Sequence, residues 1–183
     1  MKSATLVCGY GPPDIPWKGA DLAHWVAFQG GWHYTPYWFN RWFWRLDPTG
    51  RVDLPDEERM ARMLDPSRSK DLPAKDLPIF TDEDILRVML RVGNEAFAQG
   101  YDHALDDAVL TCSDFGFQIQ DIRKDLPIKL WYGKQDVFVP RVQGDQIAAR
   151  LDGRADYRLL DETHASIFFN NREAILEEIL KTM

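Results

Sequence analysis

The chain has 183 residues, 45% hydrophobic and 28% charged, proportions that fit one globular domain and exclude a disordered or fibrous protein. Its net charge of −7 argues against a nucleic-acid-binding surface, because phosphate binding needs clustered Lys and Arg. The N-terminus lacks the basic-then-apolar pattern of a signal peptide. We therefore expect a cytoplasmic protein with no nucleic-acid partner. Its two cysteines, Cys8 and Cys112, are expected to be buried and reduced rather than bridged.

The chain opens on an apolar strand at residues 4–8, which a turn rich in Gly and Pro ends at residues 9–13. A short, continuous apolar run of this kind is typical of a parallel strand buried on both faces. The residues before it are too few to cover such a strand, so we expect a bare apolar edge. A second copy of the chain or another partner chain would pair with that edge.

Residues 17–44 hold six of the seven tryptophans and are too broken by polar residues to span a membrane. Their pattern is compatible with one or two amphipathic helices, interrupted near Gly30 and Pro36. One interpretation is the dense core of a small helical cap. The other is the lining of an apolar substrate pocket. The candidate substrate-binding residues are Trp17, Trp25, Trp32 and Trp38.

The region between residues 47 and 111 is predicted to be a loop followed by helices. Proline and charged residues mark residues 47–82 as loop, with a short helix at 56–64. Thr81 and Asp82, followed by two acidic residues, predict the start of a longer helix. A further helix is predicted over residues 101–111.

The C-terminal third alternates strands and helices. We predict strands at residues 127–132 and 156–160, and helices at 141–151 and 165–181. This alternation is typical of a parallel sheet with crossover helices, and therefore of the α/β class.

Two polar residues follow these two strands. Asp136 comes after the first of them and His164 after the second, at the edge where ligands bind in open α/β sheets. The spacing between them accommodates one crossover helix and one short strand. Asp136 is then placed to accept the imidazole N–H and hold the ring for proton transfer. The alternative is that each residue only caps the helix that follows it. His24 and His33 lack convincing partners for a metal site, and we expect neither a metal nor a cofactor.

Four segments carry a resemblance to the α/β-hydrolase family. Residues 114–122 (DFGFQIQDI) and 127–140 (PIKLWYGKQDVFVP) resemble the stretch around the seventh strand of that fold, and residues 163–167 (THASI) resemble its catalytic-histidine turn. Residues 6–12 (LVCGYGP) resemble the sixth strand and its exit. The resemblance implies a partial α/β-hydrolase of about three parallel strands with flanking helices. Residues 1–13 and 111–183 would form the core portion, and residues 14–110 an aromatic-rich helical cap.

The family's nucleophile has no counterpart in this sequence. No Gly-x-Ser-x-Gly motif occurs, and the strand that carries it in the family would lie upstream of residue 1. None of the serines substitutes for it, including Ser166, which lies too close to His164 in sequence. The resemblance implies that a complete relative hydrolyses a small apolar ester or similar bond, with Asp136 and His164 as catalytic residues and the nucleophile absent here.

Two further interpretations stay open. The chain is either a truncated product or pseudoenzyme that binds an apolar ligand or partner, or one half of a split hydrolase. A missing Asp nucleophile would suit epoxide or haloalkane hydrolysis instead. In each case we expect this chain alone to be inactive, because it lacks both the nucleophile and the oxyanion donors.

Overall fold

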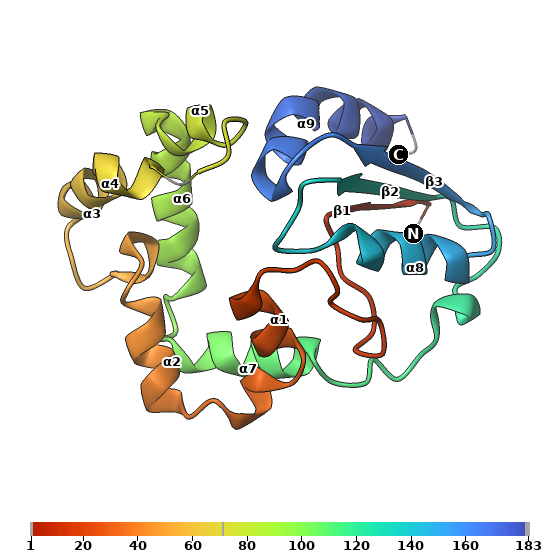
Figure 1. Ribbon diagram of the computed structural model, residues 1–183, viewed down its shortest axis with the longest axis horizontal. Coiled ribbons are helices and arrows are strands. Elements are labelled where there is room, and N and C mark those ends of the chain that lie inside the picture. Colours follow the sequence, from red (N-terminus) through yellow and green to blue (C-terminus); the bar gives the residue numbers. More distant parts are fainter. Residues whose placement is uncertain (1, 71, 182–183) are drawn as a thin grey trace. The chain divides into compact units, whose positions relative to one another are not determined.

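The computed structural model describes residues 2–70 and 72–181 and shows an α/β fold with a three-stranded parallel sheet (Figure 1). The predicted fold class, parallel strands with flanking helices, is confirmed. The strands are β1 (Ala4–Val7), β2 (Ile128–Gly133) and β3 (Ala155–Leu160). The predicted strands therefore exist, and their bounds shift by a residue or so.

The central strand of the sheet is β2, in the order β1–β2–β3. Leu130 lies opposite Leu6 on one side and Tyr157 on the other. The apolar run of β2 explains its central position, since nearly all of its residues are buried. Because both strand pairs are parallel, the three strands end side by side at one edge of the sheet.

Two helices flank this sheet: α8 (Arg141–Arg150) lies on one face and α9 (His164–Leu180) on the other (Figure 1). Each contributes buried apolar side chains to one core, including Ile147 from α8 and Ile167 from α9. At Gly144 of α8, an added Cβ would lie 2.6 Å from the Tyr132 ring, so the helix can approach β2 this closely only with glycine there.

The described residues divide into two compact units, within residues 1–29 plus 111–183 and within residues 30–110. The boundary differs from the expected one, because residues 14–29 group with the sheet. Two long-range hydrogen bonds account for this: Gln143 Nε2 donates to the Pro16 carbonyl (3.3 Å), and the Asp21 amide donates to the Val137 carbonyl (2.8 Å). Helix α1 (Leu22–Phe28) therefore belongs to the sheet unit.

The second unit is built from helices. In chain order they are η1 (Gly31–Tyr34), α2 (Tyr37–Trp44), η2 (Pro48–Gly50), α3 (Asp56–Met63), α4 (Pro66–Ser69), α5 (Leu77–Phe80), α6 (Glu83–Ala96) and α7 (Asp102–Thr111). Asp82 caps α6, as predicted, by accepting the amides of Asp84 and Ile85. The short helices α4 and α5 were not expected, because their four-residue patterns are indistinguishable from loop.

The core of the second unit combines a small apolar cluster with a buried charge. Met60, Leu86 and Leu90 form the cluster between α3 and α6. Arg59, only 1% exposed, donates to the carbonyls of Pro48 and Thr49 and to the side chains of Asp56 and Asn94. The guanidinium thereby joins α3, η2 and α6. None of the helices in the described ranges carries an apolar stretch long enough to cross a bilayer.

Candidate acid–base site

The turns after β2 and β3 are held together by backbone contacts. The Lys134 amide donates to the Leu160 carbonyl (2.8 Å), and the Gln135 amide donates to the Glu162 carbonyl (3.0 Å). Gly133 makes this approach feasible, since a Cβ there would lie 2.3 Å from the Glu162 carbonyl oxygen. These hydrogen bonds therefore fix the turn after β2 and the turn after β3 relative to each other.

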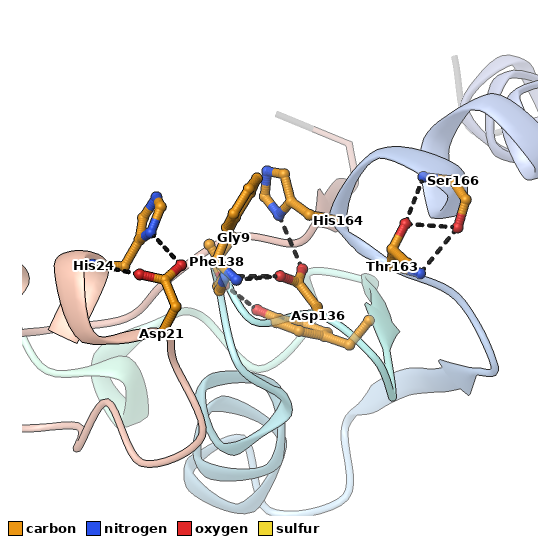
Figure 2. A network of polar contacts seen from close by, with 10 residues as sticks. Gly9, Asp21, His24, Asp136, Phe138, Thr163, His164 and Ser166 are labelled. Atoms are coloured by element: carbon orange, nitrogen blue, oxygen red, sulfur yellow. Dashed lines mark hydrogen bonds and ion pairs between the residues drawn. The ribbon is translucent and has the colours of Figure 1, made fainter. Parts of the chain in front are cut away.

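Asp136 and His164 lie within hydrogen-bonding distance, as the strand positions predict. His164 Nδ1 lies 2.9 Å from Asp136 Oδ2 (Figure 2). The Asp136 side chain is fully buried, whereas that of His164 is 39% exposed. An ionised carboxylate only accepts, so Nδ1 carries the proton in this contact and Nε2 is left as a basic nitrogen. This is the arrangement of an acid that orients a base.

The hydrogen bonds of Asp136 fix its orientation. Oδ1 accepts the backbone amides of Phe138 (2.9 Å) and Val139 (2.8 Å), which leaves Oδ2 for the imidazole. Asp136 is not a helix cap, because the residue that caps α8 is Pro140. The alternative interpretation of this residue is therefore wrong.

His164 is likewise not the cap of its helix. Thr163 caps α9, and its hydroxyl and amide exchange hydrogen bonds with Ser166 (Figure 2). Ser166 is completely buried, and its hydroxyl also donates to Glu162 (2.5 Å). This serine supports the turn that carries His164, and it is not exposed as a nucleophile would be.

Cys8 also belongs to this site, although the sequence pattern did not indicate it. It follows β1, so each of the three parallel strands delivers one polar group to the same edge: Cys8, Asp136 and His164. Single ligand atoms of these side chains lie within 4.8 Å of one another. Burial, and then the Asp136 carboxylate that the thiol contacts, raise the pKa of Cys8. The position of Cys8 at a strand end was the signal that could have found it.

A second acid–histidine pair lies beside the first one. His24 Nδ1 is 2.6 Å from Asp21 Oδ2, and the His24 amide donates to Asp21 Oδ1 (Figure 2). Burial alone would raise the pKa of Asp21, but these hydrogen bonds outweigh burial and lower the pKa. The Phe138 ring lies between the two imidazoles, with centroids 4.6 Å from His24 and 5.5 Å from His164. Sequence spacing did not reveal this pair, which depends on the turn before α1.

The four tryptophans named as substrate-binding residues are not equivalent. Trp17 is buried in the core of the sheet unit, stacked on Phe28 at a centroid distance of 4.3 Å. Trp25, on α1 of the same unit, is half exposed. Trp32 and Trp38 belong to the second unit, Trp32 in η1 and Trp38 on the exposed face of α2. The structure brings Trp17 into a core, and a substrate-binding role for the set stays a prediction.

Comparison with known proteins adds no relative. No protein-family model, curated protein or solved structure matches this chain.

Proposed function

We propose that Asp136 and His164 are the acid and base of a hydrolytic site of the α/β-hydrolase type, acting on a small apolar ester or similar bond. The observation that carries this proposal is the 2.9 Å contact between His164 Nδ1 and a buried, doubly anchored carboxylate at the ends of adjacent parallel strands. Burial of Asp136 and partial exposure of His164 suit an orienting acid and a base that meets substrate.

In the proposed reaction, the two side chains have separate tasks. His164 Nε2 takes the proton of a nucleophile, returns it to the leaving group and then activates a water. Asp136 holds the ring in the required tautomer and stabilises the imidazolium. The serines of this chain offer no counterpart to the nucleophile, so a second polypeptide would supply it, as in a split hydrolase. An Asp nucleophile from that partner would direct the same pair to epoxides or haloalkanes.

The substrate class follows from the apolar surroundings of the base. Val137 and Phe138 are both exposed by more than 40% and adjoin the Asp136 turn. Apolar side chains beside a few polar groups are typical of sites for small apolar molecules. Trp25 on α1 would extend this surface within the sheet unit.

The tautomer of His164 tests the proposed pairing. In the unmodified chain we expect the neutral ring to carry its proton on Nδ1, because Asp136 accepts it. In Asp136→Asn, that preference should be lost, since the amide offers a donor as well as an acceptor. Long-range ¹H–¹⁵N NMR spectra of the histidine rings measure both states. His24, paired with Asp21, is the matched control and should not change.

A predominant Nε2–H tautomer of His164 in the unmodified chain would contradict the proposal. So would a spectrum of His164 that Asp136→Asn leaves unchanged, because the carboxylate would then not orient the ring.

Activity of the chain alone should be at background level. We expect hydrolysis of short aryl esters no faster than that of His164→Ala, because nucleophile and oxyanion donors supply most of the rate enhancement. The measurement is release of the phenol from matched amounts of both proteins. A rate well above that of the variant would instead place an unrecognised nucleophile within this chain.

A non-catalytic role has its own structural support in the second unit. An open pocket of about 580 Å³ lies there, lined mainly by apolar side chains that include Trp44, Met89 and Phe97. Apolar pockets are typical binding sites of small apolar ligands. If the chain is a pseudoenzyme, this is where it would bind such a ligand.

We also propose that β1 pairs with a second copy of the chain. Within the described residues β1 pairs only with β2, on one side. Ala4 and Cys8 donate their amides toward β2, so the alternating amides of Thr5 and Val7 face the other way. Unpaired backbone groups on an apolar edge favour strand addition.

Thr5→Pro should weaken this association. Proline removes an outward amide without removing a bond to β2, and edge strands tolerate it. We expect the dimer dissociation constant, measured by analytical ultracentrifugation, to rise at least about tenfold. Thr5→Val keeps the amide and is the control. A monomeric unmodified chain at high concentration would contradict the proposal.

We also propose that the protein is cytoplasmic. Cys8 and Cys112 are both thiols in the structure, as expected, although Cys112 is only partly buried. Reduced cysteines suit a compartment in which thiols persist.

A further inference from the structure

We propose that Cys8, Asp136 and His164 form a binding site for a zinc-class divalent cation. The three side chains come from the ends of three adjacent parallel strands, and they combine a sulfur, an oxygen and a nitrogen ligand. This inference concerns cation binding and does not depend on the hydrolase proposal.

The distances among the ligand atoms suit such an ion. All three lie within 4.8 Å of one another. Zinc bonds of about 2.3 Å to sulfur and about 2.0–2.2 Å to nitrogen or oxygen place tetrahedral ligands about 3.5 Å apart. Shifts of about 1 Å would therefore complete the site. His164 allows them, because its side chain is partly exposed at the start of α9.

The charges of the site also favour a cation. Asp136 is buried, and in the described part of the chain its ion-pair partner is His164, with no Lys or Arg beside it. A buried carboxylate without a permanent cation is costly, and a metal ion would offset that cost. Two backbone amides bind Oδ1 of Asp136, so Oδ2 is the oxygen that faces the His164 imidazole (Figure 2).

The backbone conformation of Cys8 also supports a cation site. Its φ of 49° lies in the left-handed region, which residues other than glycine rarely adopt. Such strain clusters at ligand sites, where the surrounding structure compensates for it. The residue with this conformation carries the thiol that lies within 4.8 Å of the Asp136 carboxylate.

The ligand types select the metal. Thiolate and imidazole suit zinc and cobalt, whereas magnesium and calcium prefer sites made of oxygen alone. Three protein ligands leave a fourth position, which water would occupy. An ion in this position would engage the same Asp136 and His164 atoms that form the acid–histidine contact, and it would therefore block acid–base use of the pair.

Titration of the reduced full chain with Co²⁺ tests the site. We expect one equivalent to bind and to produce the ultraviolet charge-transfer band of a cobalt–thiolate bond, which Zn²⁺ then removes. Cys8→Ser should abolish the band, and His164→Gln should weaken binding at least about 100-fold, since even residues that only support a ligand cost 10–100-fold. Cys112→Ser and His24→Gln are the matched controls and should bind like the unmodified chain.

Three results would overturn the inference. They are no thiolate band in the unmodified chain, a band that persists in Cys8→Ser, and a band that depends on Cys112. If Cys8→Ser fails to fold, His164→Gln decides, because its partly exposed side chain can be replaced without disturbing the core. None of these readouts uses substrate, so failure here leaves the acid–base proposal to its own test.

Discussion

Gly133→Ala should destabilise the sheet unit by about 3 kcal/mol or more, because overpacking against the rigid backbone cannot relax cheaply. An added Cβ would lie 2.3 Å from the Glu162 carbonyl oxygen and 3.1 Å from that of Thr163. Both atoms belong to the turn that carries His164. We expect a thermal unfolding midpoint lower by roughly 10 °C, measured by circular dichroism.

Gly133→Ala should also disturb the geometry of the site, in addition to lowering the stability of the sheet unit. Moving the Glu162 carbonyl away would break its bond to the Gln135 amide, one of the contacts that hold the two turns together. Gly9→Ala is the matched control, since its Cβ would meet only the flexible Leu6 side chain at 3.3 Å. Equal midpoints for the two variants would show that the turns are not packed as described.

Arg59→Met should destabilise the second unit by about 3–5 kcal/mol, the usual cost of breaking a buried ionic network. The substitution keeps apolar volume but leaves the carbonyls of Pro48 and Thr49 without their donor. Buried acceptors without partners carry the full cost of desolvation. Urea unfolding followed by tryptophan fluorescence measures the loss.

The control for this variant is Arg62→Met on the same helix. Arg62 is half exposed and pairs with Glu58 one turn away, an interaction worth a few tenths of a kcal/mol. If both substitutions cost the same, the buried network around Arg59 does not stabilise the unit.

The strands and longer helices could be predicted because their signals are local. Apolar runs closed by Gly and Pro predicted β1 and β2, and Asp82 with two acidic residues predicted the start of α6. The proximity of Asp136 and His164 followed from a topological rule, that neighbouring parallel strands end at one edge.

The rest of the site depends on contacts between distant segments. Cys8 was interpreted as an ordinary buried thiol, because its proximity to Asp136 depends on β1 pairing with a strand more than 100 residues away and not only on its position at a strand end. The need for glycine at position 133 likewise arises from Glu162, in another turn. The unit boundary after residue 29 differs from the expected one because Pro16 and Asp21 have their hydrogen-bond partners in the distant residues Gln143 and Val137.

The strand pairings have a consequence for the order of folding. Leu130 pairs with Tyr157 across 27 residues (157 − 130) but with Leu6 across 124 (130 − 6). Long loops close more slowly, so β2 and β3 should pair before β1 joins them. On the ribosome, at about 5–20 residues per second, β1 is synthesised about 6–25 s before its partner strand β2. During that interval both of its edges are open, and chaperones have their best opportunity to bind the nascent chain.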